Sequence, residues 1–101
     1  MPSQVDEGFY ERADAHIHLS NEQLAVADGR GKVSASMMYG TSRFNAWITA
    51  CTFASAEQMA DARAEIVEYI CEQYRLMLEE NVDDYIKNIA KYMGSAGEGG
   101  G

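Results

Sequence analysis

Arg43 is the residue whose type and surroundings most suggest ligand chemistry. It is the one charge between Val33 and Ala56, a stretch of 24 residues, and aromatic side chains lie near it in the sequence. Each step of four residues advances about 40° around a helix, so Tyr39, Arg43 and Trp47 share one face if this stretch is helical. A guanidinium beside aromatic rings is suited to receiving a carboxylate or a phosphate. The structural alternative is an ion pair with another helix, or an arginine stem that snorkels to water.

A second candidate site is the pair Asp14 and His18, which lie one helical turn apart. A carboxylate and an imidazole are suitable metal ligands, and a carboxylate also orients a histidine that acts as a general base. His16 cannot join them, because on a helix the rings of His16 and His18 point about 200° apart. The sequence identifies no third ligand and predicts no cofactor. A solvent-exposed polar pair, with Glu22 one turn further on, is the competing interpretation.

Glu65, Glu68 and Glu72 form a third polar cluster, one turn apart on one side of a predicted helix. Such a cluster can gather a hard cation or attract a basic partner protein. Di-iron helical bundles need an inward Glu-x-x-His sequence, and this chain contains none. A solvated outer face is therefore the preferred interpretation of these three carboxylates.

Composition restricts the class of protein. The chain has 101 residues, 47% of them hydrophobic, and a net charge of −8, which argues against binding to a nucleic-acid backbone. Arg43, Asn45 and many hydroxyl residues argue against a membrane span in the low-charge stretch. The N-terminus shows no secretory leader, so we expect a cytoplasmic protein in which Cys51 and Cys71 are free, buried thiols.

Helix signals divide the chain into successive segments. Residues 1–5 are expected to form a flexible arm, and 6–94 a single helical domain. The first helix is predicted over 6–27, with Asp6 as its N-cap and a turn at 28–31 after it. The second is predicted to begin near Ser34 and to end before Ser55. Residues 95–101 are expected to form a disordered, glycine-rich tail.

The third helix has the clearest start signal. Ser55 is followed by Gln three residues later, as in a capping box. After Glu80 the apolar stripe rotates around the helix axis, which predicts a break near 81–83 and a short fourth helix that ends at Gly94. A continuous curved helix is the alternative. Asp83 and Lys87 have the spacing of an ion pair between residues i and i+4.

Several segments resemble a family of small bacterial proteins catalogued as a domain of unknown function. The resemblance implies a small, intracellular, mostly helical bacterial protein, with no assigned activity and no site residues to carry over. It covers most of residues 9–89 and is carried by the following segments: Phe9-Tyr10-Glu11-Arg12-Ala13-Asp14, Asn21-Glu22-Gln23, Gly31-Lys32-Val33-Ser34-Ala35-Ser36-Met37, Arg43-Phe44-Asn45-Ala46, and Glu72-Gln73-Tyr74 through Asp83-Asp84-Tyr85.

The sequence predicts an all-α protein, a small helical bundle of three main helices and a short C-terminal helix. The second helix has too little charge to face water on most sides, so we expect a homodimer in which another copy covers it; another protein is a further candidate partner. The expected function is a non-enzymatic interaction or structural module. The alternative is anion binding at Arg43, Tyr39 and Trp47, or a metal-dependent enzyme that uses Asp14 and His18.

Overall fold

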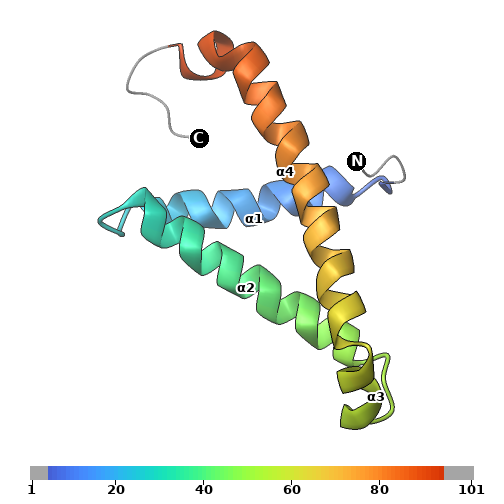
Figure 1. The fold of residues 1–101 in the computed structure, drawn as a ribbon. Coiled ribbons are helices and arrows are strands. Elements are labelled where there is room, and N and C mark those ends of the chain that lie inside the picture. Colours follow the sequence, from blue (N-terminus) through green and yellow to red (C-terminus); the bar gives the residue numbers. More distant parts are fainter. Residues whose placement is uncertain (1–4, 95–101) are drawn as a thin grey trace. The chain divides into compact units, whose positions relative to one another are not determined.

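The computed structural model describes residues 5–94, and all regular structure in that range is helical. This confirms the all-α class. The expected arm at 1–5, apart from Val5, and the expected tail at 95–101 lie outside the described residues. Four helices follow one another along the chain (Figure 1): α1 Phe9–Leu24, α2 Arg30–Ala50, α3 Ala56–Asp61 and α4 Arg63–Met93.

The chain divides into two compact units. One unit is Asp6–Asp61, which holds α1, α2 and α3. The other begins at Ala62 and contains α4. The expectation of a single domain over 6–94 stays a prediction.

Helix α1 is shorter at both ends than the sequence predicts. Asp6 lies before the helix, where its carboxylate accepts hydrogen bonds from the backbone N–H of Gly8 at 3.1 Å and from Arg12 at 2.7 Å. The hydrogen bond from Arg12 is the main reason that the pKa of Asp6 lies below its ordinary value. After Leu24 the backbone continues as a turn up to Ala27 instead of as helix.

Helix α2 begins four residues before the predicted start. Gly29 has a φ angle of 157°, a conformation that residues with side chains rarely adopt, and it ends the loop there. Asp28 and Lys32 then form an ion pair across the first turn. Ser34 therefore lies inside the helix and is not its cap, and the turn predicted at residues 28–31 ends at Gly29.

The capping box at Ser55 is confirmed. The Ser55 hydroxyl accepts a hydrogen bond from the backbone N–H of Gln58, and the Gln58 side chain accepts one from the N–H of Ala54. This helix, α3, has only six residues, since the backbone at Ala62 is not helical, with φ −95° and ψ 3°. A short helix thus precedes the long one, and the predicted break before a short C-terminal helix does not occur at 81–83.

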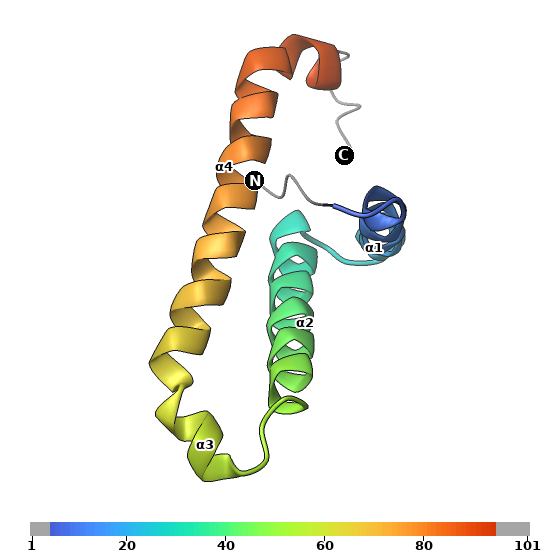
Figure 2. The same ribbon diagram turned by 90° about the vertical axis from the view of Figure 1, so that its right-hand side faces the viewer.

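Helix α4 is continuous through the predicted break at 81–83, as the alternative of one long helix requires. The Asn81 side chain donates to the Met77 carbonyl at 2.9 Å, the same carbonyl that accepts the helical hydrogen bond from the backbone of residue 81. The bend occurs later, at Asn88, where φ is −121° and ψ is 27° (Figure 2). The helix ends at Met93, before Gly94, as predicted. Within the described residues, Asp83 and Lys87 form no ion pair.

Side-chain burial is concentrated at the contact between α1 and α2. These helices meet at their connecting loop (Figure 1), and Val33, 6% exposed, is the one buried residue among 5–94. The Ser20 hydroxyl lies 3.2 Å from the sulfur of Met37 across the same contact. Cys51 and Cys71 are free but exposed. Their predicted burial is wrong, because neither lies at the α1–α2 contact.

Candidate interaction surfaces

Helix α2 presents an exposed group of aromatic side chains around one arginine, which we call the α2 patch. Its members are Tyr39, Arg43, Phe44 and Trp47, and all four are exposed. The rings of Phe44 and Trp47 lie 5.9 Å apart, centre to centre. Among the described residues Arg43 makes no ion pair, so the predicted interhelix partner is absent from this part of the chain. The structure does bring the three predicted anion-site residues onto one helix face.

The opposite side of α2 is mostly neutral and polar, with one large exposed apolar side chain, Met38. Met38 is 58% exposed, Trp47 is 60% exposed, and their positions differ by about 180° at about 100° per residue. The half-buried side chains of α2 include Asn45 and Thr49, which belong to its neutral polar face. Covering α2 would therefore remove most apolar surface from water at exposed side chains such as Met38 and Trp47.

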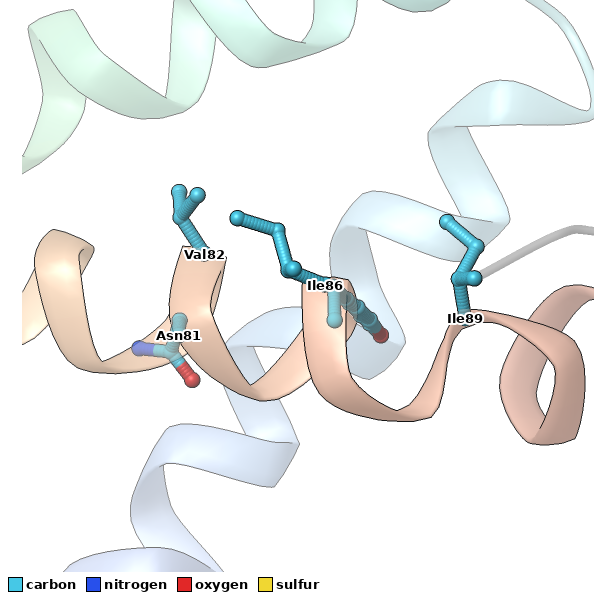
Figure 3. A pocket seen from close by; sticks show the side chains of 5 residues that line it. Asn81, Val82, Ile86 and Ile89 are labelled. Carbon is cyan, nitrogen blue, oxygen red and sulfur yellow. The ribbon is translucent and has the colours of Figure 1, made fainter.

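Helix α4 carries a second exposed apolar surface, the α4 stripe. At about 100° per residue its members fall within an arc of about 120°. Figure 3 shows Val82, Ile86 and Ile89 projecting from one side of the helix, where they help to line a shallow depression. The stripe consists of Leu78, Val82, Tyr85, Ile86, Ile89 and Tyr92, each of them exposed.

Acidic side chains border this stripe. Glu79 and Asp83 lie next to it on the helix surface, Lys87 lies one turn after Asp83, and Lys91 falls on the opposite side. Helix α4 contains seven acidic and four basic residues in all. The stripe is therefore an apolar surface with a negatively charged edge.

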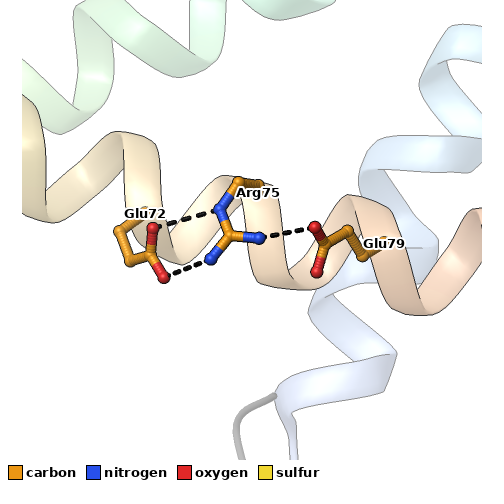
Figure 4. Close-up of polar contacts among 3 residues, drawn as sticks. All are labelled: Glu72, Arg75 and Glu79. Atoms are coloured by element: carbon orange, nitrogen blue, oxygen red, sulfur yellow. Dashed lines mark hydrogen bonds and ion pairs between the residues drawn. The ribbon is translucent and has the colours of Figure 1, made fainter.

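Arg75 forms ion pairs with two carboxylates of α4, those of Glu72 and Glu79 (Figure 4). Its guanidinium donates two hydrogen bonds to Glu72, one of them at 3.1 Å, and a further one to Glu79. The hydrogen bonds with Arg75 lower the pKa of Glu72 and raise that of the arginine. Glu72 thus has an ion-pair role in addition to the solvated one expected from the sequence.

Side-chain hydrogen bonds to Asp84 stabilise the bend at Asn88. The Asn88 amide donates to the backbone carbonyl and to the carboxylate of Asp84, at 3.2 and 2.9 Å. The Tyr92 hydroxyl donates to the same carboxylate at 3.0 Å, which raises the pKa of Tyr92. The rings of Tyr85 and Tyr92 meet edge to face at 4.7 Å. These contacts continue the α4 stripe past the bend.

Asp14 and His18, the predicted metal pair, lie one turn apart on α1. His18 pairs with Glu22, at 3.3 Å between Nε2 and Oε2, and no ion pair joins it to Asp14. No group of three or more His, Cys, Asp or Glu side chains within residues 5–94 is placed to hold a metal ion. No helix in this range has the length and apolar character needed to cross a membrane.

Sequence reasoning missed the α4 stripe as an exposed surface. It found an apolar stripe that rotates after Glu80, but periodicity shows which residues share a face and not what covers that face. The signal that could have found it is the spacing of three and four residues from Leu78 through Tyr92, which persists across the expected break.

The comparisons with known proteins agree with this architecture. A family model described as "Protein of unknown function (DUF3144)" matches residues 9–86. The chain is also similar to the NMR structure of the protein NB7890A from Shewanella sp., with 36% sequence identity and a TM-score of 0.74. That similarity covers 92% of this chain and 98% of the other. Among curated proteins, none matches the chain.

Proposed function

We propose, for a chain that belongs to the DUF3144 family of proteins of unknown function, a non-enzymatic role as a homo-oligomeric interaction module in the bacterial cytoplasm. In this proposal the helices of two copies pack as a small bundle. The observation that carries it is the lack of a core: among residues 5–94 only Val33 is buried, while large apolar side chains are exposed on both units.

Helices of this kind need a covering surface. Intrinsic propensity contributes little to helix stability in proteins, and most of it comes from packing an apolar face against another element. The exposed apolar side chains of α2 and α4 are therefore a source of stability when something buries them. Each buried methylene contributes about 0.8 kcal/mol.

The contact with α1 leaves most of the large apolar side chains of α2 exposed. Contact with α1 occurs around Val33, and exposed apolar residues lie elsewhere along the helix on opposite sides, at Met38 and Trp47. A single packed helix covers one stripe about 100° wide. The α1 contact lies on the Trp47 side of α2, since Val33 and Trp47 differ by about 40° at about 100° per residue, yet it leaves Trp47 60% exposed. In this proposal a second copy covers the apolar side chains of α2 that α1 leaves exposed.

The composition of the α2 patch also supports binding to protein. Tyrosine, tryptophan and arginine are enriched at the centres of protein interfaces, where they account for most of the binding energy. The patch holds all three types within nine residues.

Sedimentation equilibrium through a dilution series tests the proposal. The expected result is a mass at least twice that of the 11.2 kDa chain at micromolar concentration, with dissociation at lower concentration. A single species of 11.2 kDa throughout the micromolar range would overturn the proposal.

An anion site at Arg43 is the second candidate function. The observation in its favour is an arginine between two exposed aromatic rings, with no ion pair among the described residues. Thermal unfolding with added inorganic phosphate or acetate tests it. A stabilisation that disappears in Arg43→Ala, and not in Arg30→Ala, would support this function, and an equal response of both variants would argue against it.

A further inference from the structure

We propose that the α2 patch of one copy docks on the α4 stripe of a second copy. This inference rests on the proposed oligomer and adds which two surfaces meet. In a twofold-symmetric dimer the contact occurs twice, once in each direction. Its basis is the opposite charge of the two helices.

Helix α2 carries only positive charge. From Gly29 to Ala56 the chain has three bases and no acid, although its net charge is −8. Lys32 is neutralised by Asp28. Arg43 lies within the apolar α2 patch and makes no ion pair among the described residues. A partner that buries this patch must offer a carboxylate or another acceptor, because an unpaired guanidinium is costly to desolvate.

The α4 stripe offers that chemistry. Its apolar side chains are bordered by Asp83, which makes no ion pair within the described residues, and by Glu79, whose charge is shared with Arg75. Lys91 lies on the opposite side of the helix, and Lys87, one turn after Asp83, forms no ion pair with it among the described residues. An apolar surface with a free carboxylate at its edge complements an apolar surface that contains a free arginine.

The alternative pairings between copies place like charges together. Contact between two α2 patches would bring one Arg43 near the other, and contact between two α4 stripes would bring their acidic edges together. Like charges across an interface weaken it and select against the wrong register. The mixed pairing of α2 with α4 is the one that joins opposite charges.

Charge reversal tests this pairing. Mixing two charge-reversed variants then distinguishes a contact between copies from a contact within one chain. Arg43→Glu and Asp83→Lys are made in separate chains, and each is expected to weaken self-association by about tenfold. Arg30→Glu makes the same charge change at the first residue of α2, outside the patch, and is expected to leave self-association nearly unchanged. Far-UV circular dichroism checks that every variant remains helical.

An equimolar mixture of Arg43→Glu and Asp83→Lys is expected to regain the affinity of the original protein. In the mixed dimer one contact joins the introduced glutamate to the introduced lysine, and the other joins the original Arg43 to the original Asp83. Failure of the mixture to associate, with weakened separate variants, would overturn the inference and indicate contact within one chain. Separate variants that associate like the original protein would overturn it too, but would leave the proposed oligomer intact. A monomeric original protein would overturn both proposals.

Discussion

Replacing Val33 with alanine tests whether the contact between α1 and α2 stabilises this unit. Val33 is 6% exposed and is the one buried residue among 5–94. The change removes two methyl groups, worth about 1.6 kcal/mol at about 0.8 kcal/mol each. Alanine favours helix over valine by about 0.5 kcal/mol, which offsets part of that loss, while the cavity adds to it. We expect the free energy of unfolding to fall by about 1–2 kcal/mol.

Val26→Ala is the matched control, since it makes the same chemical change at a residue that is 87% exposed and outside the helices. It is expected to change the free energy of unfolding by less than about 0.5 kcal/mol. Urea unfolding followed by circular dichroism measures both variants, at one protein concentration because association contributes to stability. Equal destabilisation by the two changes, or a neutral Val33→Ala, would refute the assignment of the core to this contact.

Three further predictions concern local contacts. The pKa of Glu72 is lowered by its hydrogen bonds with Arg75, so its contribution to stability is present above the ordinary value of 4.5 and is lost as pH falls through the lowered one. Glu72→Gln should therefore lower the melting temperature at pH 7 and have a smaller effect as the pH is lowered through the acid range, and an equal loss at every pH would contradict this. Ser55→Ala removes the cap of α3 and should lower the free energy of unfolding, measured with urea, by about 1 kcal/mol. Ser34→Ala, inside α2, should not lower the free energy of unfolding, and a larger loss for Ser34→Ala than for Ser55→Ala would indicate that Ser34 is a cap after all. Stoichiometric Zn²⁺ should leave the melting temperature unchanged, and a rise that His18→Ala abolishes would restore the metal site.

The features that the sequence predicts well are local ones. The capping box at Ser55 and the helix end before Gly94 depend on residues within one turn, and both are confirmed. The start of α2 was missed because Gly29 alone supplies the required backbone conformation, while Ser34 was an equally good cap by type. At 81–83 a rotating apolar stripe looked like a break, although the helix continues.

The candidate site depends on packing, which the sequence reveals less well. Arg43, Tyr39 and Trp47 share an exposed face, as their spacing predicts. The predicted interhelix acceptor for Arg43 depends on which surfaces meet, and periodicity does not contain that information. The same limit explains the wrong prediction of buried thiols, since Cys51, directly after α2, and Cys71, within α4, are both exposed.

Fluorescence of Trp47 tests most directly whether a second copy covers the α2 patch. Trp47 is the one tryptophan in the sequence, so its emission reports on the patch alone. It is 60% exposed in the single chain, and burial by a partner would move its emission to shorter wavelength. On dilution, the emission should shift to longer wavelength over the same concentrations at which sedimentation detects dissociation. An emission maximum that stays constant while the oligomer dissociates would contradict the assignment of the α2 patch to the interface.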